Sequence, residues 1–183
     1  MKKIAIASAL ALATFAASAV NFVQVEQEHV NGRKGADGNE VSYVRFGKDV
    51  GDYNLGVQSR TARFDAGGIA SSLETTVSNK NVSVLGITPF VGVGRDFGGA
   101  AADSAYSYGL ISATTGAKIG PGFAYAGAKT RVMRQNATDP KQTVGFAGYA
   151  IPVAQNVSLN VGVSRSGQDI KEKGVSAGIS FGF

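Results

Sequence analysis

The chain ends in the stretch GVSAGISFGF, residues 174–183, in which two kinds of side chain alternate. The apolar set is Val175, Ala177, Ile179, Phe181 and Phe183, and the small set is Gly174, Ser176, Gly178, Ser180 and Gly182. A period of two places the two sets on opposite faces of a β-strand. The apolar face suits lipid and the small face suits a crowded interior, so this stretch predicts a strand at a membrane surface.

The terminal segment Ile179-Ser180-Phe181-Gly182-Phe183 resembles the closing strand of bacterial outer-membrane β-barrels. That resemblance implies that Phe181 and Phe183 form an assembly signal, through which the C-terminal strand engages the barrel-assembly machinery. It also implies a location in the bacterial outer membrane, with outer-membrane lipid around the barrel.

The amino terminus has the pattern of a secretory signal peptide. Lys2 and Lys3 precede an apolar run from Ile4 to about Ala17, and Ala17-Ser18-Ala19 reads as a small-residue cleavage site. We therefore expect a signal peptide over residues 1–19 and one transmembrane β-barrel domain over residues 20–183. A soluble exported β-protein is the alternative interpretation.

Composition narrows the chemistry. The chain has no cysteine, which excludes disulfides and thiolate metal sites. Its 25 glycines and a mean hydropathy near zero argue against a bundle of membrane helices. Removal of Lys2 and Lys3 leaves 16 basic and 13 acidic residues, with no basic run that indicates nucleic-acid binding. No motif indicates a cofactor or a metal site.

Turn-forming clusters alternate between long and short along the chain. The long ones are Asn31–Asn39, Asp65–Ser71, Arg95–Ser104, Arg134–Pro140 and Ser166–Lys171. The short ones lie near Asp49–Asp52, Asn79–Asn81, Ile119–Gly122 and Pro152–Asn156. In outer-membrane barrels the strand count is even, the outer loops are long and the periplasmic turns are short. Nine such connections predict an all-β, antiparallel, up-and-down transmembrane barrel of ten strands with both termini periplasmic.

Two features leave the strand count open. Eight strands would result if Ser72–Ser78 were a loop excursion, and Pro89 weakens the fifth strand because proline cannot donate to the ladder. We expect Leu85, Ile87, Val91 and Val93 on the lipid face of that fifth strand. The sixth strand is also irregular, because Ile111 breaks the alternation set by Tyr106, Tyr108 and Leu110.

The alternation assigns a set of charged side chains to the barrel interior. This candidate lumen-lining set is Glu26, Glu28, Arg45, Arg60, Glu74, Lys129 and Arg131. Lys129 and Arg131 are turned inward because a charge facing lipid at mid-membrane costs about 2–4 kcal/mol. Buried charges must pair or stay hydrated, so the set forms either an ion-pair plug or the wall of a narrow channel.

Small inner-face residues favour the channel. The inner faces of the fifth, ninth and tenth strands are mostly Gly, Ser and Thr, which do not fill a ten-stranded lumen. The excess of inward Arg and Lys then favours anions. Aromatic residues near strand ends are expected to form girdles at the membrane interfaces. They are Tyr43, Tyr53, Phe64, Phe97, Tyr106, Tyr149 and Phe183.

Catalysis has one set of candidates. His29, the only histidine, lies at the outer end of the first strand, with Asp37 in the next loop. The serines that could approach it are Ser71, Ser72 and Ser104. No local motif of the outer-membrane protease, phospholipase or palmitoyltransferase families is present, so we expect no enzyme activity.

The opening hairpin carries a further resemblance. Glu26-Gln27-Glu28-His29 followed by Tyr43-Val44-Arg45-Phe46 resembles small monomeric porins for acidic oligosaccharides, which normally have longer chains and more strands. The chain is equally similar to opacity-type and attachment-type barrels. Three hypotheses follow: a monomeric narrow pore for small solutes or ions, a plugged barrel whose outer loops bind partners, and a lipid-modifying enzyme that uses His29.

Overall fold

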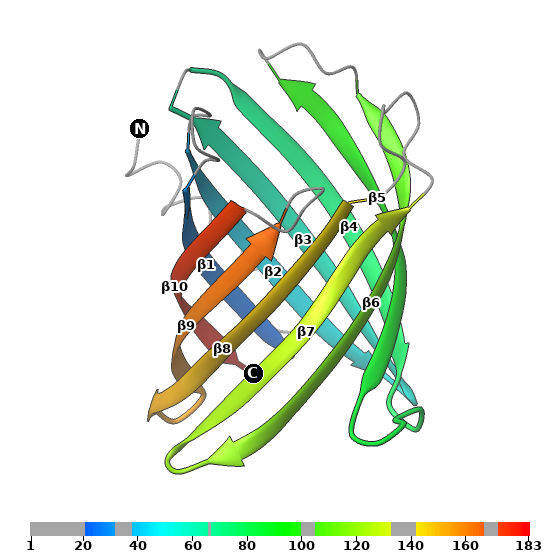
Figure 1. Cartoon of the computed structure of the whole chain (residues 1–183). Helices are drawn as coiled ribbons and strands as arrows, with labels where there is room; N and C mark the ends of the chain where they lie inside the picture. Colours follow the sequence, from blue (N-terminus) through cyan, green and yellow to red (C-terminus); the bar gives the residue numbers. More distant parts are fainter. Residues whose placement is uncertain (1–20, 32–37, 66, 100–104, 133–141, 167–171) are drawn as a thin grey trace.

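The computed structural model describes residues 21–31, 38–65, 67–99, 105–132, 142–166 and 172–183. These ranges contain ten β-strands (Figure 1). They are β1 (Phe22–Asn31), β2 (Asn39–Val50), β3 (Tyr53–Phe64), β4 (Ile69–Asn79), β5 (Thr88–Gly99), β6 (Tyr106–Ile119), β7 (Gly122–Val132), β8 (Gln142–Ala154), β9 (Val157–Ser166) and β10 (Glu172–Gly182). No helix among the described residues is long and apolar enough to cross a membrane. The expected signal peptide, residues 1–19, lies outside the described ranges.

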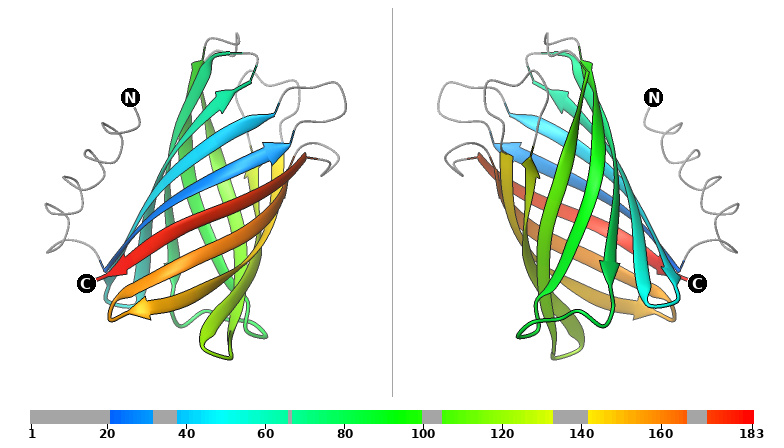
Figure 2. Two further views of the ribbon diagram at one scale, coloured as in Figure 1. Left: turned by 90° about the vertical axis from the view of Figure 1, so that its left-hand side faces the viewer. Right: turned by 90° about the vertical axis from the view of Figure 1, so that its right-hand side faces the viewer.

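Each strand pairs antiparallel with its neighbours in sequence, and β1 pairs with β10 to close the barrel. The strands are strongly tilted against the barrel axis (Figure 2). The predicted ten-stranded, up-and-down barrel is therefore confirmed. The eight-strand alternative is wrong, because residues 72–78 lie within β4, which pairs with both β3 and β5.

The connections distinguish the two ends of the barrel. At one end, here called the turn end, lie the β2–β3, β4–β5, β6–β7 and β8–β9 connections and both ends of the described chain. There the amide of Phe183 donates a hydrogen bond to the carbonyl of Asn21, 2.9 Å away. The five other connections lie at the opposite end, here called the loop end, and each of them contains undescribed residues.

Two connections differ most from the expected boundaries, and β4 also begins at Ile69, within the expected loop Asp65–Ser71. Strand β5 continues to Gly99, so the third loop is shorter than the range that begins at Arg95. The β4–β5 connection is longer than the range Asn79–Asn81, because β5 begins only at Thr88. Leu85 and Ile87 were therefore wrongly assigned to the fifth strand: Leu85 has a φ of 54°, which an extended strand does not accommodate.

Both strand prolines lie where the ladder is interrupted. Pro89 pairs with Ala113 of β6, but the ladder between β4 and β5 begins only at Val77 and Val91. Pro152 lies at a register shift between β8 and β9. The missing proline amide is tolerated at both positions because no regular hydrogen bond is required of it there.

The outer surface carries an apolar belt. Residues that pair directly on neighbouring strands point to the same face of the sheet. The outward-facing residues therefore form a continuous band around the closed barrel. The exposed belt contains Leu55, Val57, Leu73, Val91, Val93, Ile111, Leu159, Val161, Val163 and Val175. A barrel whose outside is apolar and whose inside holds the charges is arranged for a lipid environment.

Strand β6 keeps strict alternation. Tyr106, Tyr108 and Leu110 are buried in the interior, and Ile111 is exposed on the outside. Ile111 therefore does not break the pattern. The sequence looked irregular because both faces of the strand carry large apolar residues at that point.

The expected aromatic girdle is only partly correct. Tyr53, Phe97 and Phe183 are exposed. Tyr43, Phe64 and Tyr106 instead belong to the interior, where Tyr43 and Phe64 pack against Val30, Val41 and Ala62. Their strand-end positions in the sequence did not reveal which face they occupy.

Candidate functional site: the barrel interior

The barrel encloses a cavity of about 370 Å³, lined by residues from all ten strands. Five members of the candidate lumen-lining set contribute to its wall: Glu26, Glu28, Arg45, Glu74 and Lys129. The other two, Arg60 and Arg131, lie on the inward positions of β3 and β7. Arg60 pairs directly with the interior residues Tyr43 and Ser72, and Arg131 bonds to Glu74.

Glu74 is the centre of the interior network. Its carboxylate, 3% exposed, accepts hydrogen bonds from Lys129 Nζ at 2.8 Å and from Arg131 Nη2 at 2.7 Å. Tyr108 Oη donates to it at 2.9 Å, and Gln58 Nε2 donates at the same distance. The two cations come from β7 and Glu74 comes from β4, so the contact crosses the interior between strands that are not neighbours. This cluster narrows the lumen on one side.

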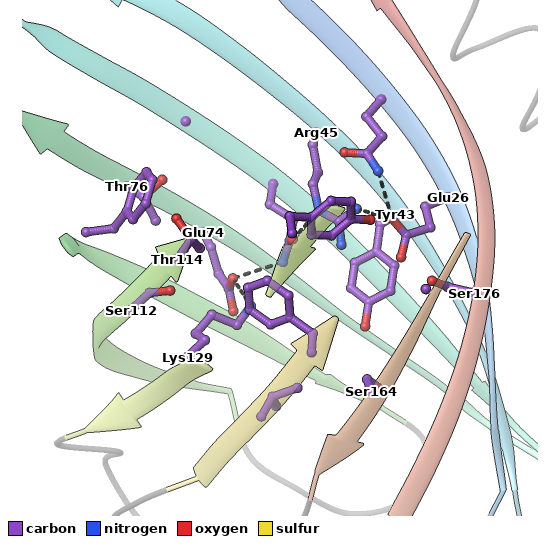
Figure 3. Close-up of a pocket in the computed structure, with 18 of the residues that line it drawn as sticks. Glu26, Tyr43, Arg45, Glu74, Thr76, Ser112, Thr114, Lys129, Ser164 and Ser176 are labelled. Carbon is purple, nitrogen blue, oxygen red and sulfur yellow. Dashed lines mark hydrogen bonds and ion pairs between the residues drawn. The ribbon is translucent and has the colours of Figure 1, made fainter. Parts of the chain in front are cut away.

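The network continues from Gln58 around the wall. Gln58 Oε1 accepts a hydrogen bond from Arg45 Nε at 2.7 Å, and Arg45 Nη1 lies 2.6 Å from Glu26 Oε2. Gln24 Nε2 also donates to that carboxylate oxygen, at 2.8 Å. The chain of contacts therefore runs through one side chain on each of β1, β2, β3 and β4 before it reaches β7 (Figure 3). This side of the interior, formed by β1–β4 and β7, is called the charged wall.

The side formed by β8, β9 and β10 is called the small wall because many of its inward residues are small, although Val144, Phe146 and Asn160 also line the cavity there. The small inward residues include Gly148, Ala150, Gly162, Ser164, Ser176, Gly178 and Ser180. Figure 3 shows Ser164 and Ser176 at the edge of the cavity, away from Glu74 and Lys129. Larger side chains from other strands lie over some of these positions: a Cβ added to Gly148 would meet Tyr125 Oη, and a Cβ added to Gly174 would meet Glu28 Oε1.

Glu28 joins the two walls. Tyr43 Oη, on the charged wall, donates to Glu28 Oε2 at 2.7 Å, and Ser164 Oγ, on the small wall, donates to Glu28 Oε1. One carboxylate is thus satisfied by hydroxyls from β2 and β9. Without these donors, a largely buried carboxylate would be unfavourable.

The interior also contains aromatic residues that contact the charged side chains. Tyr108 bonds Glu74, and the guanidinium of Arg131 lies 4.7 Å from the centre of its ring. The guanidinium of Arg45 lies over the Tyr43 ring at 4.5 Å. Alternation along each strand indicates these inward positions. Tyr43 lies two residues from the inward Arg45, and Tyr108 lies three residues from the lipid-facing Ile111.

The catalytic candidates do not come together. His29 lies on the outer face, where Nδ1 is 2.6 Å from Glu40 Oε1 and Nε2 is 3.2 Å from Asn31 Oδ1. Ser72 points to the interior, on the other side of the barrel wall, and is almost fully buried. Ser71 shares its outward face with Thr61 of β3, and its Oγ lies 3.5 Å from Thr61 Oγ1.

The remaining two candidates, Asp37 and Ser104, lie outside the described residues. Within the described ranges, no group of three or more His, Asp or Glu residues is placed to hold a metal ion.

No protein-family model matches the chain, and no curated protein sequence matches it. Its structure is similar to that of the KdgM porin, with a TM-score of 0.53 and 9% identity over 88% of this chain and 99% of the porin. A second structure, the KdgM porin in complex with disordered oligogalacturonate, matches with a TM-score of 0.53, 10% identity and the same coverage. The translocator domain of the autotransporter NalP from Neisseria meningitidis matches with a TM-score of 0.48, 13% identity, and 88% and 87% of the two chains covered.

The two porin matches agree with the closed antiparallel sheet and the apolar belt. This chain therefore has the fold of a small outer-membrane β-barrel.

Proposed function

We propose that this chain is a narrow pore of the bacterial outer membrane, which passes small solutes and prefers anions. The observation that carries the proposal is the asymmetric interior. The cavity of about 370 Å³ lies between the charged wall, which contributes Glu26, Arg45, Glu74 and Lys129, and the small wall, which contributes Gly162, Ser164 and Ser176. Charged groups on the wall of a narrow passage bias which ions enter it.

Anion preference is assigned chiefly to Arg60. Arg45, Lys129 and Arg131 each form an ion pair with Glu26 or Glu74, which offsets their charge. No ion pair within 4 Å involves Arg60 among the described residues. Glu28 and Asp96 also face the interior without an ion pair among the described residues, so the proposed preference depends on the position of Arg60 along the passage rather than on an excess of interior cations.

The orientation follows from the connections. Short turns face the periplasm in outer-membrane barrels and long loops face outward. We therefore place the turn end, with both termini of the mature chain, in the periplasm, after removal of residues 1–19. The proposed pore is a monomer and uses no cofactor or enzymatic activity.

Single-channel conductance in a planar bilayer tests the pore directly. Folded protein is expected to give discrete steps with anion preference, and Arg60→Glu is expected to shift the selectivity toward cations. Arg63→Glu is the matched control, because Arg63 is exposed on the outward face of the same strand. Silence from protein shown to be folded by heat-dependent gel mobility would overturn the pore. It would favour a plugged barrel whose loops bind partners.

Short acidic oligosaccharides are the proposed solute class. The structurally similar porin was solved in complex with disordered oligogalacturonate. The cavity of this chain has Arg45 and Lys129 beside the rings of Phe90, Tyr125 and Phe146 in its wall, and its three carboxylates are already bonded to cations or hydroxyls. Liposome swelling should be faster with an acidic trisaccharide than with a neutral one of equal size. Equal swelling rates with the two trisaccharides would mean that the pore does not select acidic solutes.

The last strand is proposed to engage the barrel-assembly machinery through Phe181 and Phe183. Phe181 pairs with Val23 of β1 at the seam of the barrel, and Phe183 is half-exposed beyond it. Phe183→Ala should lower the amount of assembled barrel in cells while leaving refolding of the purified chain into vesicles unchanged. An equal loss in both assays would instead indicate a role in stability.

A further inference from the structure

The β4–β5 connection differs from the other connections at the turn end. The other three have two residues each, Gly51-Asp52, Gly120-Pro121 and Gln155-Asn156, none of which is a large aliphatic residue. The β4–β5 connection instead runs over residues 80–87 and exposes four aliphatic side chains. They are Val82 (45% exposed), Val84 (66%), Leu85 (95%) and Ile87 (45%).

The tip of this connection is a tight hairpin with an unusual residue in it. The backbones of Val84 and Ile87 exchange two hydrogen bonds, of 3.0 and 2.9 Å, around Leu85 and Gly86. Both central residues have positive φ, 54° and 76°, which is the pattern of a turn that normally selects Asn, Asp or Gly. Leucine is unfavourable in that conformation, and its side chain gains almost no contact with the protein in return.

The base of the connection is fastened to the neighbouring β2–β3 turn. The amide of Lys80 donates to the carbonyl of Asp52 at 2.7 Å, and Lys80 Nζ donates to the carbonyl of Gly51 at 3.0 Å. The same Nζ lies 3.1 Å from the carboxylate of Asp49. These contacts fix the start of the connection against the β2–β3 turn.

The tip lies on the lipid side of the barrel. A Cβ added to Gly86 would lie 3.9 Å from Oγ1 of Thr115, an exposed residue on the outward face of β6. Val91 and Ile119, on β5 and at the end of β6, are also exposed. The apolar tip is thus continuous with the outer belt rather than directed into the lumen.

We propose that the tip, residues 84–87, inserts into the lipid leaflet at the turn end and anchors the barrel there. Burial of Leu85 among acyl chains supplies the favourable apolar transfer that the protein itself does not provide at this residue. The anchor rests on the proposed membrane location but not on the proposed pore activity.

The absence of cysteine makes the test direct, because a single introduced cysteine is the only thiol in the chain. Leu85→Cys and Val84→Cys are each labelled with an environment-sensitive fluorophore and refolded into phosphatidylcholine vesicles, with and without brominated acyl chains. The expected result at both positions is a blue-shifted emission that brominated lipid quenches several-fold more strongly than at Asp52→Cys. Asp52 is the matched aqueous control, since it is exposed in a turn at the same end.

Val161→Cys, on the outer belt, is the lipid-facing control. If the probe at Val161 is quenched and the probes at Val84 and Leu85 are not, the anchor is wrong and the membrane location stands. If the probe at Val161 also remains aqueous, the membrane location fails and the anchor fails with it. Heat-dependent gel mobility of each labelled variant verifies that the barrel has folded.

Discussion

The charged wall and the small wall line the same wide lumen with different kinds of side chain. A ten-stranded barrel is too wide for short side chains to fill. On β1–β4 and β7, long charged side chains reach inward and satisfy one another, as Glu74 does with Lys129 and Arg131. On β8–β10, most inward residues that line the cavity are small, such as Gly162, Ser164 and Ser176, and Phe146 is the large exception. The difference teaches that one half of the interior supplies rigidity and the other half supplies the proposed passage.

The largest expected effect comes from removing the centre of the charged wall. Glu74→Gln leaves Lys129 and Arg131 without their anionic partner inside the barrel. We expect the free energy of unfolding to fall by about 3–5 kcal/mol, as is usual when one member of a buried ion pair is removed. Urea unfolding of the barrel in lipid vesicles measures this loss.

The control for that measurement is Glu40→Gln. Glu40 is exposed on the outer face beside His29, so its loss should change the free energy of unfolding by less than about 1 kcal/mol. Similar values for the two variants would mean that water, rather than Glu74, compensates the interior cations. The proposed difference in rigidity between the charged wall and the small wall would then be wrong.

A substitution on the small wall should change transport more than stability. Ser176→Tyr places a ring in the open part of the lumen, opposite the charged wall, and conductance is expected to fall several-fold. Ala177→Tyr, the next residue along β10, faces lipid and should leave conductance unchanged. Unchanged conductance in Ser176→Tyr would show that ions do not pass along the small wall.

The smallest expected effect concerns the link between the walls. Tyr43→Phe and Ser164→Ala each remove one hydroxyl from Glu28 and should each lower the free energy of unfolding by about 1–2 kcal/mol. Because both hydroxyls serve one carboxylate, the loss in the double variant should differ from the sum of the single losses. Simple additivity in this double-mutant cycle would mean that the walls are energetically independent.

Most of the architecture was accessible from the sequence because its signals are local. Alternation with a period of two shows directly which residues share a face, and glycine- and aspartate-rich clusters mark turns. The stretch 80–88 is the main exception among the connections. Val82, Val84 and Leu85 with Ile87 resemble a strand in composition, and only the backbone conformation at Leu85 and Gly86 shows that the chain turns there.

The partners within the lumen were less accessible. Arg131 is 57 residues from Glu74 and Tyr108 is 34 residues away, so no sequence spacing connects them. Tyr43 and Tyr106 were expected at the membrane interface because they lie near strand ends. Their inward positions follow from parity, which a position near a strand end does not reveal.

The sequence by itself determined the apolar outer face and the inward charges, because each depends on alternation within a single strand. Its turn clusters favoured ten strands over eight, and the pairing of β4 with both β3 and β5 decided between them. The tertiary structure decided which charges meet, which side of the lumen remains open and where the β4–β5 tip points. Those features depend on the closure of β1 against β10 and on the stagger of ten tilted strands, which bring distant residues to the same height. Contacts across a closed barrel are a property of the whole sheet, and therefore only the folded chain specifies them.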